Sequence, residues 1–458
     1  MSKLPNSNNY VDSNIMWIGA YPSRWNLTQV KYEAYVKARV GWHGLKSDDF
    51  TDEGPYLVTG SDFKSTNISW SDCYHCDLKR YEQDPYIQLK NGDLLITKDG
   101  TIGKVALVQQ LAINEKATLN SGVFVVRPLE SNFLSGFYFW LLQSRVFTDF
   151  VDYNKTGSTI VHLYQDTFVN FSYASPKFKE QTQIAAFLDH ETAKIDTLID
   201  KQQQLIELLK EKRQAVISHA VTKGLDPDVP MKDSGVEWLG EVPEHWKVIY
   251  IKHLSEVKRG ASPRPIDDQK YFDEEGEYAW TRIADVSLAG MYLKDTQQRL
   301  SSLGSSLSVK LERGELFLSI AGTVGKPCIT TSKACIHDGF VYFPSLKINN
   351  KYLFYIFDAG QAYLGLGKMG TQLNLNTDTV GCIKVALPPS LEIHEIVSYI
   401  VKQKEKYDLL ITSAYEFIEL IQERRTALIS AAVTGKIDVR GWKPPASAST
   451  SELAQEAV

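Results

Sequence analysis

The sequence predicts an α+β fold, in which two mixed α/β segments are separated by two long antiparallel coiled-coil helices. Three observations predict it. Residues 176–222 recur as residues 388–434 at a constant offset of 212, their apolar residues recur at helical spacing, and shorter paired motifs extend the repeat. A repeat of this kind indicates the architecture of the whole chain more strongly than any single element does. We therefore expect an internal pseudo-twofold frame.

Each copy of the repeated stretch predicts one long helix. Neither Gly nor Pro interrupts the chain between Gln181 and Thr222, or between Leu391 and Thr434. An a/d stripe at 3.5-residue spacing predicts a coiled coil, and some 40 residues at about 1.5 Å each make a rod of roughly 60 Å. The stripe consists of Ile184, Leu188, Ile195, Leu198, Leu205, Leu209 and Val216, and of Ile396, Ile400, Tyr407, Leu410, Phe417, Ile421 and Leu428.

Polar residues at Gln202, Lys212 and Arg424 interrupt the pattern, and we expect them to help fix the register of the helix pair at some cost in stability. The alternative is that the two stretches are ordinary long helices inside one globular core.

Paired motifs outside the helices show that the whole chain is duplicated. The pattern Trp-(Ile/Leu)-Gly-x-x-Pro-x-x-Trp at 17–25 returns at 238–246, and residues 92–104 return as 314–326. The intervening residues are unrelated. Each half is therefore a variable α/β segment followed by a nearly fixed helix.

The predicted divisions follow from this pattern. We expect a first variable segment at 1–175, a central helix at 176–222, a linker and second variable segment at 223–387, a distal helix at 388–434, and a tail at 435–458 that is disordered at its end. Strands are expected at 93–97, 105–108, 123–126, 316–320 and 340–343, and short aromatic-rich helices at 133–150 and 353–364.

Composition restricts the function classes. The net charge of −5 argues against a protein that coats nucleic acid indiscriminately, although a local basic groove remains compatible with it. Five scattered cysteines, an odd number, favour a reducing compartment over a disulfide framework. No signal peptide or apolar run of membrane-spanning length is evident. We expect a soluble, cytoplasmic protein with no membrane partner.

The candidate motifs for chemistry are weak. Residues 365–370 match GxGxxG, but no apolar helical face follows them. Cys73-Tyr-His75-Cys76 resembles half of a zinc site, yet no second Cys or His pair lies at a suitable distance. Residues 100–104 and 322–326 read either as plain hairpin turns or as turns whose lysine meets a phosphate. No constellation typical of a methyltransferase, nuclease or helicase is present. We expect a non-catalytic chain with no metal or cofactor of its own.

The order of segments resembles the specificity subunit of type I restriction–modification systems. The paired Trp motifs, the paired Gly-Thr-(Ile/Val)-Gly-Lys turns and the helix endings at 212–218 and 424–430 carry the resemblance. The Gln-x-x-Ile opening at 181–184 fits too, although the second copy has Glu392-Ile-His-Glu395-Ile396 instead. The resemblance covers nearly everything from Asp12 to about Asp438.

This resemblance implies a role in host defence. Each variable segment would be a target recognition domain that reads one half of an asymmetric, bipartite site in double-stranded DNA. The helices would set the spacer between the halves and dock two methyltransferase subunits of an adenine-methylating complex. Restriction (translocase) subunits would join that core, and S-adenosylmethionine, ATP and Mg²⁺ would be bound by the partner subunits. The alternative is a coiled-coil scaffold with no DNA readout.

Candidate DNA-binding residues follow from the chemistry of the contacts. Phosphates are bound by Lys, Arg and hydroxyl groups, and base edges by Arg, Asn, Gln, Ser and Thr. The loop at 259–264 is an especially good candidate, because it is basic and holds a proline. The predicted residues are Lys98, Thr101, Lys104, Lys155, Ser158, Thr159, Arg259, Arg264, Arg282, Thr323, Lys326, Lys368, Thr371, Gln372 and Asn374.

Overall fold

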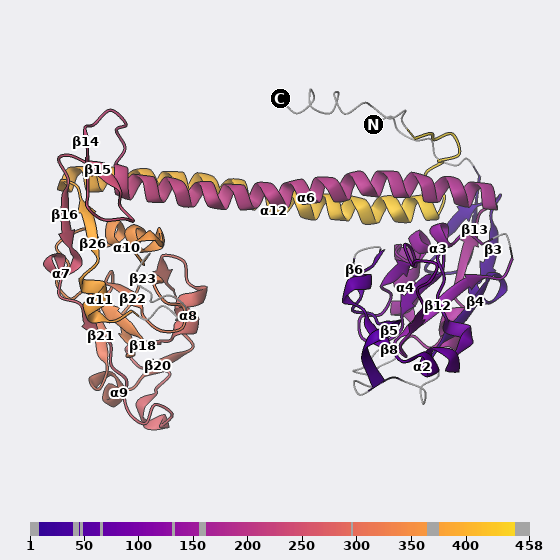
Figure 1. Cartoon of the computed structure of the whole chain (residues 1–458), viewed down its shortest axis with the longest axis horizontal. Helices are drawn as coiled ribbons and strands as arrows, with labels where there is room; N and C mark the ends of the chain where they lie inside the picture. The colour runs from indigo at the N-terminus through magenta and orange to yellow at the C-terminus, as the bar shows by residue number, and fades with distance from the viewer. Residues whose placement is uncertain are drawn as a thin grey trace. The chain divides into compact units, whose positions relative to one another are not determined.

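The computed structural model describes residues 9–39, 45, 49–64, 67–130, 133–154, 162–294, 296–363 and 375–444. The chain divides into two compact units (Figure 1). The first consists of Met1–Gln202 with Glu416–Val458, and the second of Gln203–Tyr415. Each unit is a mixed α/β body with part of both long helices, and the predicted α+β fold class is confirmed.

The two long helices are α6 (Phe178–Lys223) and α12 (Ser390–Val433). A glycine in the left-handed conformation follows each helix, Gly224 at φ +80° and Gly435 at φ +69°. Glycine takes this conformation without the penalty of a Cβ, which is why it commonly ends helices. The repeated sequence thus gives both helices the same ending.

Ion pairs show that the helices run antiparallel. In the first unit Arg425 Nε lies 3.0 Å from Asp196 Oδ1. In the second unit Arg213 pairs with Asp408. Adding 212 converts Arg213 into Arg425 and Asp196 into Asp408, so the two pairs are copies of one another. Figure 1 shows the helices side by side.

The predicted a/d stripe is right at its start and wrong in the middle. Ile184, Leu188, Ile396 and Ile400 are buried, as expected. Further along, Leu205 is 42% exposed and Phe417 37% exposed, whereas their neighbours Ile206 and Ile418 are 2% and 7% exposed. Leu198 and Leu410 are exposed too.

The cause is a four-residue shift in the heptad phase. After Ile400 the next buried residues of α12 are Ile411, Ala414, Ile418 and Ile421, and of these the predicted stripe includes only Ile421. The step from Ile400 to Ile411 is one heptad plus four residues, an insertion that locally unwinds a coiled coil. A strict seven-residue repeat that continues past Ile400 therefore assigns exposed residues to the buried face of the helix. Lys212 is exposed and does not occupy the helix interface where we expected it. Arg424 is exposed too, but it lines the groove between α6 and α12.

The first unit is built around an antiparallel sheet in the order β10-β9-β12-β4, beside a smaller sheet β11-β5-β8. Its elements are β1 (Tyr10–Asp12), β2 (Ala20–Pro22), β3 (Asn26–Gln29), α1 (Val30–Glu33), β4 (Ala34–Ala38), β5 (Phe50–Val58), β6 (Phe63–Lys64), β7 (Asn67–Ile68), η3 (Trp70–Asp72), β8 (Tyr74–Cys76), α2 (Leu78–Gln83), η4 (Pro85–Ile87), β9 (Leu94–Thr97), β10 (Val105–Leu107), β11 (Ala117–Leu119), β12 (Val123–Pro128), α3 (Ser135–Leu141), α4 (Arg145–Tyr153), α5 (Gln165–Val169) and β13 (Ser172–Ser175). The helix expected at 133–150 is thus two helices.

The second unit repeats this plan with sheets β17-β25-β22-β23-β19 and β20-β18-β24-β21. Its elements are β14 (Met231–Asp233), β15 (Glu241–Pro243), β16 (Lys247–Tyr250), α7 (Ile251–Leu254), β17 (Lys258–Arg259), η5 (Gln269–Tyr271), β18 (Tyr278–Thr281), α8 (Ile283–Leu288), β19 (Tyr292–Leu293), β20 (Gln298–Leu300), α9 (Ser302–Ser306), β21 (Val309–Leu311), β22 (Leu316–Ser319), β23 (Pro327–Thr330), β24 (Ala334–Ile336), β25 (Phe340–Tyr342), α10 (Asn350–Asp358), η6 (Gln361–Tyr363), α11 (Thr377–Gly381) and β26 (Lys384–Leu387). All five expected strands are present in the two units.

The paired tryptophan motifs join each variable segment to the helix ends. Trp25 and Trp246 are buried, at 3% and 0% exposure. A Cβ on Gly224 would lie 3.2 Å from Trp246, and one on Gly435 would lie 3.1 Å from Trp25. The same packing therefore occurs at both helix endings. In the first unit it brings the end of α12 to the beginning of the chain, where the Tyr10 hydroxyl donates to the Gly435 carbonyl at 2.8 Å.

Candidate nucleic-acid interface

The two Gly-Thr-(Ile/Val)-Gly-Lys turns have the same hydrogen bonds. In the first unit Thr97 Oγ1 donates to the Thr101 carbonyl and accepts from Lys104 N at 2.9 Å. In the second, Ser319 Oγ donates to the Thr323 carbonyl and accepts from Lys326 N. Both turns contain two glycines with positive φ. The hairpin-turn interpretation is therefore correct for both, and the side chains that each turn presents decide what it can contact.

In the first unit this turn carries an acid beside its basic residue. Lys98 Nζ lies 3.4 Å from Asp99 Oδ2, and His162 Nδ1 lies 2.7 Å from Asp99 Oδ1. Thr101 and Lys104 are exposed. The predicted contacts Lys98, Thr101 and Lys104 thus share one turn, where they are accessible to a phosphate backbone.

In the second unit side chains of the equivalent turn contact α8. Thr323 Oγ1 and Ser287 Oγ are 2.6 Å apart, and Lys326 Nζ donates to the Ser287 carbonyl at 2.7 Å. A Cβ on Gly322 would lie 2.8 Å from Ile283 Cγ2. Lys326 and Thr323 are therefore already engaged by α8, which makes them weaker candidates than their counterparts.

Arg282 is also engaged. Its backbone N–H donates to Asp285 Oδ2 at 2.8 Å at the start of α8, and its guanidinium donates to Gln298 Oε1. The side chain of this residue therefore links β18 to β20 as well as being a candidate contact.

The basic loop at 259–264 lies against the turn between β24 and β25. Arg264 Nη2 lies 3.1 Å from Asp338 Oδ2, and Arg259 Nε donates to the Asp338 carbonyl at 2.6 Å. Ser262 Oγ donates to Asp338 Oδ1 at 3.2 Å. The structure brings these predicted residues together, and Asp338 is the residue that connects them.

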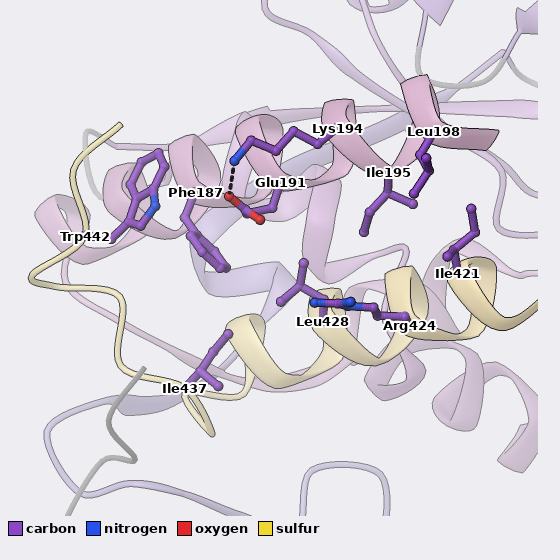
Figure 2. Close-up of a pocket in the computed structure, with 10 residues that line it drawn as sticks. All are labelled: Phe187, Glu191, Lys194, Ile195, Leu198, Ile421, Arg424, Leu428, Ile437 and Trp442. Carbon is purple, nitrogen blue, oxygen red and sulfur yellow. Dashed lines mark hydrogen bonds and ion pairs between the residues drawn. The ribbon is translucent and has the colours of Figure 1, made fainter. Parts of the chain in front are cut away.

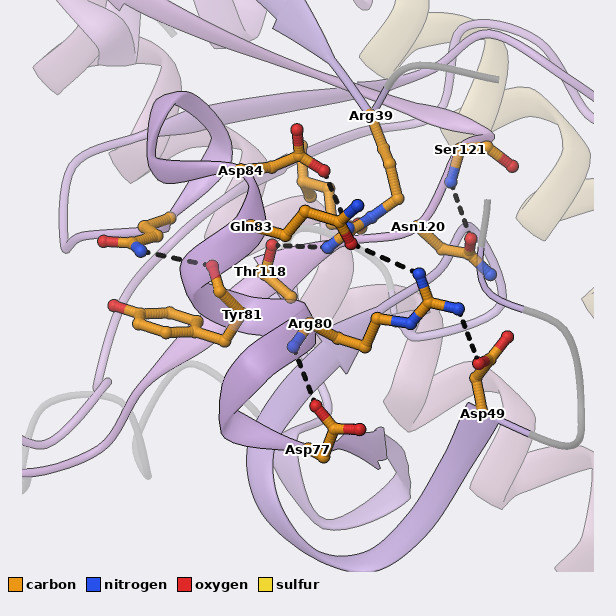
Figure 3. A network of polar contacts seen from close by, with 12 residues as sticks. Arg39, Asp49, Asp77, Arg80, Tyr81, Gln83, Asp84, Thr118, Asn120 and Ser121 are labelled. Carbon is orange, nitrogen blue, oxygen red and sulfur yellow. Dashed lines mark hydrogen bonds and ion pairs between the residues drawn. The ribbon is translucent and has the colours of Figure 1, made fainter. Parts of the chain in front are cut away.

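A buried arginine occupies the equivalent place in the first unit (Figure 3). The Arg39 side chain is 0% exposed. Its Nη1 lies 2.9 Å from Asp84 Oδ2, its Nη2 donates to Thr118 Oγ1 at 3.1 Å, and its Nε donates to the Leu119 carbonyl at 2.8 Å. In the second unit the carbonyl of Ile336, which matches Leu119, accepts instead from Ala261 N. The Arg39 side chain in the first unit thus donates the hydrogen bond that a backbone N–H of the 259–264 loop donates in the second.

Seven of the predicted contacts lie outside the described residues: Lys155, Ser158, Thr159, Lys368, Thr371, Gln372 and Asn374. The assignment of these residues to DNA contact stays a prediction.

Asp338, Asp99 and His162 are not among the predicted residues, because the prediction rests only on cations, hydroxyls and amides. An Asp-Gly pair directly before a predicted strand, as at 338–339, was the available signal.

Cys73 and Cys76 lie at β8 in the first unit. Both thiols are buried, and burial raises the pKa of Cys73 to about 12. Within the parts of the chain that the structure describes, no cluster of three or more His, Cys, Asp or Glu side chains could hold a metal ion. Across the same residues, no helix is both long enough and apolar enough to span a membrane.

A groove of about 410 Å³ lies in the first unit between α6 and α12 (Figure 2). Phe187, Ile195, Ile421, Leu428 and Trp442 contribute apolar side chains to it. The ion pair between Glu191 and Lys194, 3.1 Å long, lies at its edge. The groove therefore offers an apolar floor with charged residues at its edge, which is typical of a protein-binding surface.

The family model of the type I restriction modification DNA specificity domain matches residues 44–208 and 243–428. The chain is 23% identical over 372 residues to the type I restriction enzyme MjaVIII specificity subunit of Methanocaldococcus jannaschii, covering 77% of this chain and 81% of that one. It is 24% identical over 447 residues to the putative type I restriction enzyme MjaX specificity subunit of the same organism, covering 92% and 96%.

Among solved structures, the fold is similar to a chain from a study of complex assembly and conformational transition of the type I R-M system. The TM-score is 0.70 at 16% identity, with 91% of this chain and 99% of that chain covered.

Proposed function

The chain belongs to the type I restriction–modification DNA specificity family, and we propose that it is the DNA-reading, non-catalytic subunit of such a complex. One observation carries the proposal: the family model matches twice, and each match includes the glycine turn and most of the sheet strands of one unit. Two units with the same frame and different surface residues suit a DNA target with two unlike halves.

Each recognition unit reads one half of the target in this proposal. In the first unit the accessible turn around Lys98 and Thr101 contacts the DNA, and in the second the loop around Arg259 and Arg264 does so. Basic and hydroxyl side chains on ordered turns can bind phosphates and base edges. Sequence information then lies in the unlike residues, while the long helices are common to both halves.

The test is to sequence the methylated DNA of cells that express this chain with its methyltransferase partner. Substitutions confined to residues 12–175 should alter only one half of the methylated sequence, and those confined to 233–387 only the other. A set that alters both halves would contradict the proposal. The comparisons give no support to the scaffold alternative, which predicts no sequence-specific protection of DNA in a footprint.

The long helices set the distance between the half-sites in this proposal. Half-sites read on one face of B-DNA lie about one helical turn, ~34–36 Å, apart. Inserting one helical turn after Thr222 should lengthen the spacer between the methylated half-sites and leave their sequences intact. An unchanged spacer would count against this role.

The same helices are proposed to dock two methyltransferase subunits, with restriction (translocase) subunits joining the complex. Large apolar side chains remain exposed along them, including Leu208 at 61%, Leu409 at 67% and Leu420 at 61%. The groove between α6 and α12, lined in part by Trp442, adds an apolar depression in the first unit. Exposed apolar patches of this kind mark protein interfaces. S-adenosylmethionine, ATP and Mg²⁺ would be bound by those partners.

Docking can be tested by co-purification. Leu409→Asp should reduce recovery of the methyltransferase partner, because a carboxylate would enter an apolar interface. Tyr32→Asp, at a position in α1 that is 67% exposed, serves as the control outside the long helices. Equal recovery with both variants would contradict docking through the helices.

A further inference from the structure

Asp338 lies between two arginines that the sequence assigns to DNA contact. The carboxylate accepts from Arg264 Nη2 at 3.1 Å through Oδ2 and from Ser262 Oγ at 3.2 Å through Oδ1. Its backbone carbonyl accepts from Arg259 Nε at 2.6 Å. No other group in the described part of the chain forms a hydrogen bond with the Arg264 guanidinium, which keeps donors for a ligand.

The backbone of the 259–264 loop is held by bonds that do not involve the Asp338 carboxylate. Gly260 N donates to the Phe340 carbonyl at 2.9 Å, and Ala261 N to the Ile336 carbonyl at 3.1 Å. The Tyr271 hydroxyl donates to the Arg264 carbonyl at 2.9 Å. Removing the carboxylate therefore frees side chains and leaves the loop backbone in place.

The position of the loop is also fixed by close packing. A Cβ on Gly260 would lie 2.1 Å from the His337 carbonyl oxygen, so only glycine fits against this turn. Ile283 connects the 337–339 turn with the glycine turn at 322–325. A Cβ on Gly339 would contact Ile283, and Ile283 also packs against Gly322. The loop, the 337–339 turn and the glycine turn at 322–325 thus form one ordered edge of the second unit.

Stability alone does not account for the Asp338–Arg264 pair. The Arg264 side chain is 78% exposed and that of Asp338 is 42% exposed. Ion pairs at such exposed positions contribute little to folding. The pair attaches the Arg264 guanidinium to the 337–339 turn through Nη2, and a preorganised fork loses less freedom when it forms two parallel hydrogen bonds.

We propose that Asp338 is a positioning residue that orients Arg264 to read a guanine in the half-site of the second recognition unit. Arginine donates to O6 and N7 of guanine in the major groove, the commonest base-specific contact. The inference rests on the proposed DNA-reading function and deepens it. It names Arg264 as the residue that contacts a base, guanine as that base, and Asp338 as the residue that positions Arg264. The matching turn position in the first unit is Ser121, which has no carboxylate and provides a matched control.

The experiment uses the complete chain assembled with its methyltransferase partner, and DNA libraries randomised across the second half-site. Arg264→Ala should relax selection at one G·C pair by roughly ten- to a hundredfold. Asp338→Ala should relax the same pair by a smaller factor, and the double variant should be no worse than Arg264→Ala. Arg264→Lys should restore selection only in part, because lysine lacks the rigid planar fork of the guanidinium.

Three controls separate the possible explanations. Ser121→Ala should leave selection at both half-sites unchanged, and the melting temperature of Asp338→Ala should match that of the parent. Uniform weakening across all sequences, with a salt slope reduced by about 1, would mean that Arg264 contacts a phosphate, and this would overturn the proposal. Unchanged selection in Asp338→Ala would overturn it too. If the parent complex itself shows no sequence preference, the proposed function fails and not merely this inference.

Discussion

The two recognition units share a backbone frame and differ in the charged groups fixed to it. In both, a hydroxyl at the end of the central strand, Thr97 or Ser319, closes the same glycine turn. In the first unit an arginine side chain, Arg39, is buried beside the turn before β12. In the second a glycine, Gly260, takes that place and lets a basic loop pass. The comparison indicates that the hydrogen-bonded frame can stay constant while the reading surface changes.

The largest expected effect distinguishes the units at this position. Arg39→Ala should lower the free energy of unfolding by about 3–5 kcal/mol, because it removes one member of a buried, hydrogen-bonded ion pair. Arg259→Ala, at an exposed position of the second unit, should cost less than about 1 kcal/mol. Urea unfolding of the two variants measures both. Equal losses would show that the two places are not as different as their burial implies.

A second pair of variants tests what the units have in common. Ile206→Ala and Ile418→Ala, at equivalent positions of the two long helices, should each cost about 2–4 kcal/mol through lost burial and cavity formation. Leu205→Ala should cost less than about 1 kcal/mol, because Leu205 is already 42% exposed. Thermal melts compare the three. A larger loss of stability for Leu205→Ala than for Ile206→Ala would favour the strict heptad pattern, in which Leu205 is the buried residue.

Sequence reasoning predicted the frame better than the reading surface, for physical reasons. Repeats, heptads and glycine turns depend on local spacing, and a single chain displays them directly. The shift of the buried positions after Leu188 and Ile400 was missed, because the prediction assumed a strict 3.5-residue period. Such a period does not show where four extra residues change the heptad phase. Asp338 was missed because acidic residues were not considered as contacts, and because its partners lie 74 to 79 residues away in sequence, so that only the fold brings them together.

The equivalent glycines of the two turns should differ in their tolerance of alanine. Gly103 and Gly325 both have positive φ, at +83° and +84°, so alanine costs about 1–2 kcal/mol at either. At Gly325 the new Cβ would also lie 2.7 Å from the Tyr363 ring, against 3.5 Å from Phe147 at Gly103. Gly325→Ala should therefore be the more damaging, at about 2–3 kcal/mol. Chemical denaturation measures the difference, and a reversed order would mean that Tyr363 moves aside freely.

The smallest expected effect concerns the duplicated ion pairs between the helices. Asp408→Asn and Asp196→Asn should each cost about 0.5–1 kcal/mol at pH 7, because both carboxylates are partly exposed. Burial raises the pKa of Asp408, but hydrogen bonds from Lys404 and Arg213 more than offset this, so its pKa lies below the ordinary value. A carboxylate with a lowered pKa stabilises the fold above its unfolded pKa of about 3.9.

The stabilising contribution of Asp408 should therefore be complete at neutral pH and disappear as the pH falls through its folded pKa. The difference in unfolding free energy between wild type and Asp408→Asn should be constant from pH 7 to about pH 5 and shrink below about pH 4. Urea unfolding across this range measures it, with Leu205→Ala as a variant whose effect should not depend on pH. A difference that grew on acidification would show that Asp408 is destabilised by burial rather than held by Arg213 and Lys404. The two ion pairs would then be equivalent in sequence but not in their contribution to stability.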